Sequence, residues 1–405
     1  MRKKFISLVC VLFSVGLIGC SSKEKITLWT PFTGPAGVHF EEIVEKYNAT
    51  SPAFEIEYMP TPDMYTQIYT VMNSNDNSNV PDLLVGHIER IPLFKEQGMI
   101  NDIEEVIKNQ ENLVGKNFLP QAWNAGEIDG KRYAIPLDIH SIILYYNEDL
   151  LNKYAPRTLD DKVITWDEIL EIAPVAAQDG IVTFPSRILG WLVNSMVAQQ
   201  GGNIHEGAKP TLNTAEALHA LETLIEIQKV GGMQVDGDDA ELLFNSGESI
   251  FIEEGIWYQN NLLNNEDFTV KTANTPVFTE DLLATWSSSH QFMELSKERT
   301  PEKQEAIGDF LEFVRLNSET WANGGQNVAS VEVYKDDSYY ERPQGFLMSN
   351  DMELNSMKIF SFLNYGIVDQ SYGTLLNDAI YGRISAKEAL DTAQKTAEDL
   401  LKEGN

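Results

Sequence analysis

Residues 25–98 alternate between two hydrophobic repeats. Mostly apolar runs at 26–29 and 82–86 predict buried strands, and alternation of apolar and acidic residues at 54–58 predicts a half-buried strand. Between them, apolar residues from 40 to 47 recur at the spacing of one helix face. Strands separated by helices indicate a mainly parallel sheet, so this part of the chain is predicted to form an α/β lobe.

Start signals mark three later helices. Asn213 and Ser385 each stand three residues before a glutamate, which is capping-box spacing. Thr300 precedes a proline, the preferred residue of a first helical turn. The last helix is expected to bury one apolar face, formed by Ala389, Leu390, Ala393, Ala397 and Leu400.

The first twenty residues have the pattern of an export signal. Three basic residues at 2–4 precede an apolar stretch at 5–18, which is too short to span a bilayer as a permanent helix. The stretch ends in Leu-Ile-Gly before Cys20, which resembles the lipobox of bacterial lipoproteins. This resemblance implies cleavage after residue 19 and lipidation of Cys20, which would hold the protein on the extracellular face of the cell membrane. The alternative is an ordinary secretory signal with a chance cysteine.

Cysteine usage agrees with an exported protein. Both cysteines, Cys10 and Cys20, lie in the signal segment. The mature chain would therefore have no side chain for a cysteine nucleophile, a thiolate metal site or an iron–sulfur cluster. Two acyl chains on Cys20 would supply the two signals that stable membrane anchoring requires.

The net charge of the chain limits the binding partners that it can have. The chain has 30 basic and 61 acidic residues, a net charge of −31, with 43% hydrophobic residues. Because three of the basic residues and none of the acidic ones precede residue 20, the mature chain of 386 residues would carry −34. Such a surface repels phosphate backbones and anionic lipids, so no nucleic-acid partner and no membrane contact of the folded part are expected.

Motifs of known catalytic machinery are absent from the sequence. It has no G-x-S-x-G, no phosphate-binding glycine loop and no H-E-x-x-H, although 61 acidic residues leave a glycosidase-like carboxylate pair open. No two of the six histidines have the spacing of local metal ligands. A long-range metal site that combines His140 with Tyr145 or Tyr146 is an alternative to the simpler interpretation of alternating strand side chains.

Tryptophan placement points to carbohydrate. Four of the seven tryptophans, Trp29, Trp191, Trp257 and Trp286, stand beside turn residues rather than within apolar stripes. A flat aromatic ring covers the C–H face of a pyranose, while neighbouring polar side chains bind its hydroxyls. Packing in the core is the alternative for each of these rings.

Five motifs in order carry a family resemblance. They are ITLWTPFTGP at 26–35, VPDLLVG at 80–86 with Glu89-Arg90, GKRYAIP at 130–136 with LYYN at 144–147, FNSGE at 244–248 with GIW at 255–257, and YGRISAKEAL at 381–390. With them, the chain from residue 26 resembles the family 1 extracellular solute-binding proteins of ABC importers, which include the maltose-binding protein.

This resemblance implies an α/β fold of two periplasmic-binding-protein-like lobes (type II), discontinuous in sequence and joined by a hinge. After the signal peptide at 1–19, the N-terminal lobe would comprise 26–138 plus 289–334, and the C-terminal lobe 144–286 plus 338–405. The implied function is that of a non-catalytic, monomeric receptor without cofactor or metal. It would capture a di- or oligosaccharide between its lobes and deliver it to an ABC permease.

The resemblance also implies a set of ligand-binding residues, namely Phe32, Thr33, Glu89, Arg90, His140, Trp191, Trp257, Ser289 and His290. Glu89 matches the acidic residue that binds sugar hydroxyls, and Trp257 matches the stacking tryptophan.

Two departures from the maltose-binding protein argue against maltose itself. His140 replaces a hinge glutamate, and Gly86 replaces an aromatic residue. Two alternative functions stay open. One is a secreted glycan-cleaving enzyme, and the other is a receptor for a metal or another small solute on the same fold.

Overall fold

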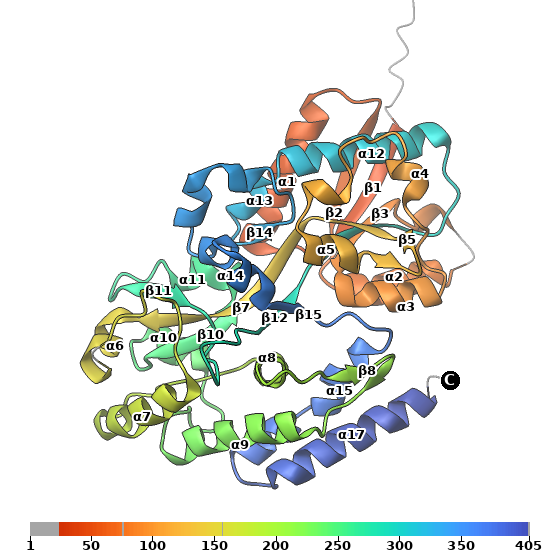
Figure 1. Cartoon of the computed structure of the whole chain (residues 1–405). Coiled ribbons are helices and arrows are strands. Elements are labelled where there is room, and N and C mark those ends of the chain that lie inside the picture. Colours follow the sequence, from red (N-terminus) through yellow and green to blue (C-terminus); the bar gives the residue numbers. More distant parts are fainter. Residues whose placement is uncertain (1–23, 75–76, 156, 404–405) are drawn as a thin grey trace, which may run out of the picture.

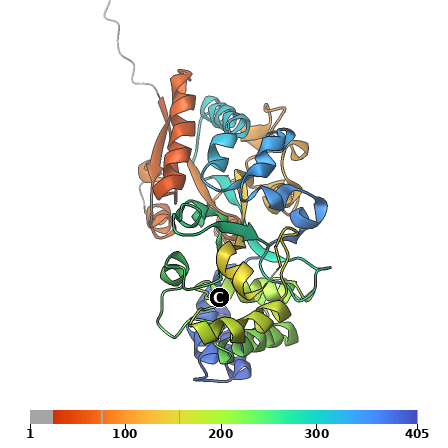
Figure 2. The ribbon, with the colours of Figure 1, turned by 90° about the vertical axis from the view of Figure 1, so that its left-hand side faces the viewer.

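A computed structural model describes residues 24–74, 77–155 and 157–403. The predicted signal segment and Cys20 lie outside the described residues. The described chain forms two lobes of mixed α/β structure, one above the other in two perpendicular views (Figures 1 and 2).

The sheet of the first lobe is built around the predicted N-terminal strands. β1 (Glu24–Thr30) pairs in parallel with both β2 (Phe54–Pro60) and β3 (Leu83–His87), which confirms the three predicted strands. On the other side of β3, β13 (His290–Glu294) and then β6 (Ala134–Pro136) add antiparallel pairings. The sheet is therefore mixed, because β13 enters it from the opposite direction after passing through the second lobe.

Helices cover both faces of this sheet. Ile26 and Leu28 face one core together with residues of α1 (Gly34–Ala49) and α12 (Pro301–Leu316), whereas Trp29 faces another with α2 (Met64–Met72) and α3 (Ile91–Glu96). The period of two along β1 thus divides its side chains between two hydrophobic layers. The predicted helix over 40–47 is confirmed as part of α1.

The second lobe is organised on one long strand. β7 (Asp138–Asn147) pairs with four of the other five strands of this sheet. The fifth, β15 (Met357–Ile359), lies at the edge and pairs with β12. The partners of β7 are β10 (Phe251–Gly255), β11 (Val270–Ala273), β12 (Thr285–Ser288) and β14 (Asn327–Val328). The main helices of this lobe are α6 (Glu148–Tyr154), α7 (Trp166–Ala176), α8 (Leu189–Ala198), α9 (Ala215–Lys229), α15 (Tyr365–Tyr372), α16 (Leu375–Ile380) and α17 (Ala386–Glu403).

Shorter helices complete the fold. They are α4 (Glu104–Ile107), α5 (Pro120–Ala125), α10 (Ala240–Asn245), α11 (Gln259–Leu262), α13 (Glu319–Ala322) and α14 (Asp351–Ser356). No described helix is both long and apolar enough to cross a membrane.

Helix caps test the predicted start signals. Thr300 Oγ1 accepts the backbone N–H of Lys303 at the start of α12, and Ser385 Oγ accepts that of Glu388 at the start of α17, as predicted. The prediction for Asn213 is wrong by one residue. Thr214 caps α9, because the Asn213 amide instead donates to Asp391 of α17, 3.2 Å away.

Two strand segments pass from one lobe to the other. Ile139 of β7 packs in the first-lobe core and Ile142 in the second, while Ser289 alone separates β12 from β13. Nearer the C-terminus, Tyr339 packs in a first-lobe core and Leu347 in a second-lobe core. The exact limits predicted for the lobes stay a prediction.

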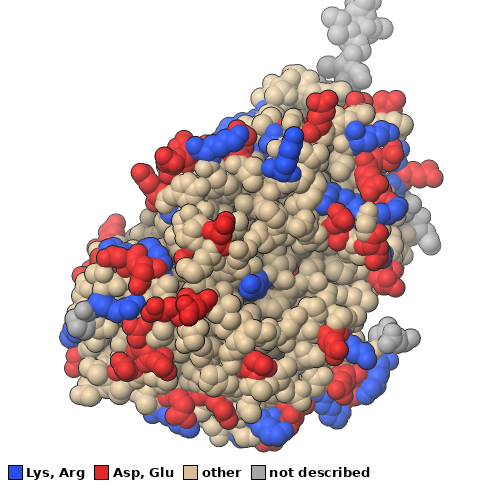
Figure 3. Space-filling model, in the orientation of Figure 1, with Lys and Arg blue, Asp and Glu red and all other residues tan. Residues whose placement is uncertain are grey.

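Charged side chains gather along the margins of both lobes on the face seen in Figure 3, and the middle of that face is mostly uncharged. The large negative charge is therefore not concentrated between the lobes on this face.

Candidate functional site

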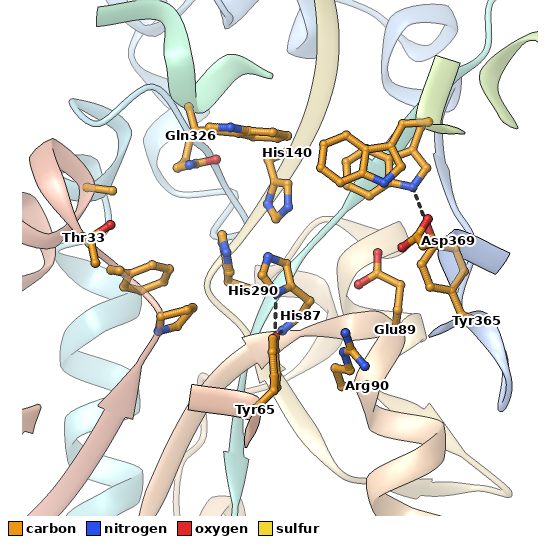
Figure 4. A pocket seen from close by; sticks show the side chains of 16 residues that line it. Thr33, Tyr65, His87, Glu89, Arg90, His140, His290, Gln326, Tyr365 and Asp369 are labelled. Atoms are coloured by element: carbon orange, nitrogen blue, oxygen red, sulfur yellow. Dashed lines mark hydrogen bonds between the residues drawn. The ribbon is translucent and has the colours of Figure 1, made fainter. Parts of the chain in front are cut away.

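A cavity of about 370 Å³ lies between the lobes. Ligand pockets commonly enclose about 300–1,000 Å³, so its size suits a small molecule. Figure 4 shows its side chains converging from both lobes. The lining residues are Pro31, Phe32, Thr33, Ala36, Tyr65, His87, Glu89, Arg90, His140, Trp191, Trp257, Trp286, His290, Gln326, Tyr365 and Asp369.

Three tryptophans of the second lobe form the aromatic wall. The rings of Trp191 in α8 and Trp286 in β12 are stacked, with centroids 4.3 Å apart and planes 8° from parallel. Trp257 meets Trp191 edge to face at 6.1 Å. The indole N–H of Trp286 donates to the Tyr365 hydroxyl at 2.8 Å. This wall combines broad apolar faces with fixed ring orientations.

Gly255, at the end of β10, allows Trp257 to lie where it does. A Cβ at Gly255 would come within 2.2 Å of the indole ring, far closer than real contacts. One face of Trp257 therefore packs on the backbone, and the half-buried ring lines the cavity. Only glycine at position 255 permits this close approach.

Asp138, at the start of β7, holds the polar side of the cavity together. Its carboxylate accepts from His140 Nδ1 at 3.1 Å, from His290 Nδ1 at 2.7 Å and from the indole N–H of Trp321 at 2.7 Å. Burial alone would raise the pKa of Asp138, but the two histidines outweigh it and hold that pKa well below its ordinary value. Asp138 is thus an anion that orients both rings.

His87, the last residue of β3, is oriented by Tyr65 of α2. The Tyr65 hydroxyl lies 2.6 Å from His87 Nδ1, and it also accepts the backbone N–H of His87. Burial and the two neighbouring histidines keep the pKa of His87 well below its ordinary value, so the ring is neutral. Tyr65 also lies close to the missing side chain of Gly86, since a Cβ there would be 3.4 Å from its hydroxyl.

Glu89 and Arg90 follow in the short 3₁₀ helix after β3, Ile88–Arg90. Glu89 is buried, and its Oε1 has no hydrogen-bond partner among the described residues. Burial raises the pKa of Glu89 to about 7. The Arg90 guanidinium lies over the Tyr65 ring, 4.7 Å from its centroid. The cavity therefore offers an unsatisfied carboxyl group and a fixed cation to a polar ligand.

Within the described part of the chain, three histidines lie close enough together to hold a metal ion. His87, His140 and His290 each offer one ring nitrogen, and these nitrogens lie within 4.8 Å of one another. Figure 4 shows His87 and His290 next to each other, with His140 between them and the tryptophan rings.

The structure brings eight of the nine predicted ligand-binding residues to the cavity. Phe32 is buried and packs edge to face on His290, while Thr33 is exposed at the rim. Ser289 does not line the cavity, because its hydroxyl turns inward and donates to the backbone carbonyl of Asp138. The alternative site that combined His140 with Tyr145 is wrong, since Tyr145 is buried in a separate core and donates to the carbonyl of Gly255. Tyr146 likewise belongs to the second-lobe core.

Sequence reasoning missed several lining residues. His87 directly follows the strand predicted at 82–86, and side chains at the carboxyl ends of strands in α/β sheets commonly bind ligands, so a signal existed. Trp286 lines the cavity too, and its position beside three serines is the sequence signal for it. Tyr365 and Asp369 carry no signal, because a helix far along the chain brings them to the cavity.

Comparisons with known proteins agree with this architecture. A family model described as "Bacterial extracellular solute-binding protein" matches residues 42–323. An arabinooligosaccharide-binding protein of Halalkalibacterium halodurans is 23% identical over 92% of this chain and 89% of its own length.

Two solved structures have the same fold. Maltose-bound MalE3 of T. maritima has a TM-score of 0.76 and 22% identity, covering 93% of this chain and 99% of that one. UgpB of Mycobacterium tuberculosis in complex with glycerophosphocholine also has a TM-score of 0.76, with 14% identity over 94% of this chain and 99% of that one.

Proposed function

The chain belongs to the bacterial extracellular solute-binding proteins, and from this premise we propose that it captures a di- or oligosaccharide in the cavity between its lobes. The proposal includes delivery of the sugar to a membrane ABC permease and excludes catalysis. The observation that carries it is the aromatic wall of Trp191, Trp257 and Trp286 opposite polar groups of the first lobe.

The chemistry of the wall suits a pyranose. Aromatic rings cover apolar C–H faces, and groups such as the Glu89 carboxyl and the Arg90 guanidinium bind hydroxyls. The ligand of the arabinooligosaccharide-binding relative supports the same class. The phosphate group of a ligand such as glycerophosphocholine is less well matched. Arg90 is the only lysine or arginine among the lining residues, and two carboxyl groups, Glu89 and Asp369, line the cavity with it.

A tryptophan-fluorescence titration tests this proposal. The mature chain is titrated with a panel of α- and β-linked di- and trisaccharides and with glycerophosphocholine. We expect a saturable change with at least one sugar at micromolar concentration, which corresponds to about 8 kcal/mol of binding free energy. Saturation by glycerophosphocholine alone would contradict the proposal. Release of reducing sugar over time would instead identify a glycan-cleaving enzyme.

We also propose that the mature protein is a monomer held outside the cell by lipid on Cys20. Support for the lipid anchor comes from the basic residues 2–4, the apolar stretch 5–18 and the residues before Cys20. Mass spectrometry of the mature N-terminal peptide tests it: a diacylglyceryl-modified Cys20 is expected, and an unmodified terminus at another residue would contradict it.

A further inference from the structure

Three histidines from three different strands meet on one side of the cavity. His87 ends β3, His140 lies in β7, and His290 begins β13. The His140 and His290 ring centroids are 4.4 Å apart, and His87 lies 4.7 Å from His290 and 5.8 Å from His140. His140 and His290 are almost fully buried, with 2% and 7% of their surface exposed.

Each ring is fixed through the same nitrogen. Asp138 accepts from Nδ1 of His140 and of His290, and the Tyr65 hydroxyl lies 2.6 Å from Nδ1 of His87. Asp138 is itself completely buried and held by the Trp321 indole N–H. Because a carboxylate only accepts, His140 and His290 donate Nδ1–H to Asp138, and the lone pair of each neutral imidazole lies on Nε2. His87 offers its Nε2 lone pair in the tautomer that donates Nδ1–H to Tyr65. In protein metal sites, ligating histidines are oriented by such carboxylate or hydroxyl partners.

We propose that a divalent transition-metal ion of the Zn²⁺ class binds to Nε2 of His87, His140 and His290. Three imidazoles match Zn²⁺ and its neighbours, whereas Mg²⁺ and Ca²⁺ require oxygen ligands. Zn–N bonds of about 2.0–2.1 Å place tetrahedral ligand atoms about 3.3 Å apart. One ring nitrogen of each histidine already lies within 4.8 Å of the other two, so adjustment of the rings would bring the three Nε2 atoms to this spacing.

The fourth coordination position would face the cavity. All three histidines line it, so a water molecule or a ligand hydroxyl could occupy that position. Three protein ligands with one open position are the arrangement of zinc sites that bind exogenous groups. The metal site goes beyond the proposed sugar binding and does not rest on it.

Calorimetric titration with Zn²⁺ alone tests the site. The mature chain is treated with a chelator, dialysed and titrated with ZnCl₂, and Co²⁺ is added in parallel. We expect one Zn²⁺ per chain, a rise in melting temperature on Zn²⁺ addition, and the intense visible bands of four-coordinate Co²⁺.

Variants locate the ion. His140→Gln and His290→Gln should each weaken Zn²⁺ binding by at least about 100-fold, since each removes one of three ligands. His219→Gln is the matched control. His219 lies on α9 and stacks on Phe278, away from the cavity, so this variant should bind Zn²⁺ like the wild type.

Absence of stoichiometric Zn²⁺ binding by the folded wild-type chain would overturn the inference without reference to any variant. Binding that survives both His140→Gln and His290→Gln would overturn it as well, with circular dichroism confirming that the variants are folded. Sugar titrations in the presence of chelator run beside these measurements. Sugar binding without Zn²⁺ binding refutes only the metal site, and Zn²⁺ binding without sugar binding refutes only the proposed function.

Discussion

Asp138 accepts hydrogen bonds from its own strand and from two segments that lie far along the chain. His140 lies two residues away, His290 begins β13, and Trp321 belongs to α13. A buried carboxylate with several donors is stable only when all of them are in place. Asp138 therefore fixes the polar side of the cavity before any ligand arrives.

Glu253 is a second buried carboxyl group, and it lacks such partners. Neither of its oxygens has a hydrogen-bond partner among the described residues. Burial, and next the charge of Glu254, raise the pKa of Glu253 well above its ordinary value. The folded state thus binds a proton that the unfolded state releases above about pH 4.3, and stability falls as pH rises beyond that value.

Glu253→Gln should therefore stabilise the protein at pH 8. We expect its melting temperature to exceed that of the wild type by at least about 2 °C at pH 8, with the difference shrinking towards pH 4. Thermal unfolding at both pH values measures this. Glu248→Gln, at an exposed position, is the control and should show no such trend. A variant less stable than the wild type at pH 8 would contradict the assignment.

At the scale of elements, the pattern of apolar and polar residues predicts a helix or strand where that element buries a face of its own. The apolar run in β1, the period of two in β2 and the helical period in α1 predicted these three elements, because each buries at least one face. The antiparallel entry of β13 and the histidine cluster were not predictable. They depend on which distant strands become neighbours, and residues 87, 140 and 290 share no local spacing.

A cluster of ion pairs joins the start of β3 to the segment after β13 and to α12. Asp82, just before β3, is almost fully buried and contacts Lys297 at 3.0 Å, Arg299 at 3.2 Å and Lys303 of α12 at 3.1 Å. Burial alone would raise the pKa of Asp82. The Thr27 N–H and the surrounding cations outweigh burial and lower that pKa.

Asp82→Asn should destabilise the protein at pH 7, because it leaves three cations around a neutral group. Removing one partner of a buried ion pair costs about 3–5 kcal/mol. A depressed pKa contributes stability above the unfolded value of about 3.9, and this contribution is lost as pH falls through the folded value. Urea unfolding should therefore show a large deficit at pH 7 that narrows towards pH 3.

The surface pair of Asp102 with Lys131 provides the control. Asp102→Asn should change the unfolding free energy by no more than about 1 kcal/mol, because solvent screens exposed pairs. Equal effects of the two substitutions would contradict a special role for Asp82.

At the scale of the whole molecule, both lobes line the cavity, and only a few crossing segments join them. Phe32 and Glu89 lie on one side, and Trp191 and Asp369 lie on the other. A ligand that contacts both lobes binds the closed arrangement more tightly than the open one and shifts the population towards it.

Small-angle X-ray scattering should therefore report a smaller radius of gyration when a binding sugar is added. A sugar that leaves the fluorescence unchanged is the control and should leave the radius unchanged too. An unchanged radius with saturating ligand would argue against closure of the lobes.

The central claim is that the tryptophan wall binds a sugar, and calorimetric titration of Trp257→Ala tests it most directly. Trp123→Ala, which removes a ring outside the cavity that lies over Arg132, is the matched control. With the sugar that binds the wild type, Trp257→Ala should lose at least about tenfold in affinity, or about 1.4 kcal/mol, while remaining folded. The control should retain wild-type affinity. Unchanged affinity of folded Trp257→Ala would contradict the account.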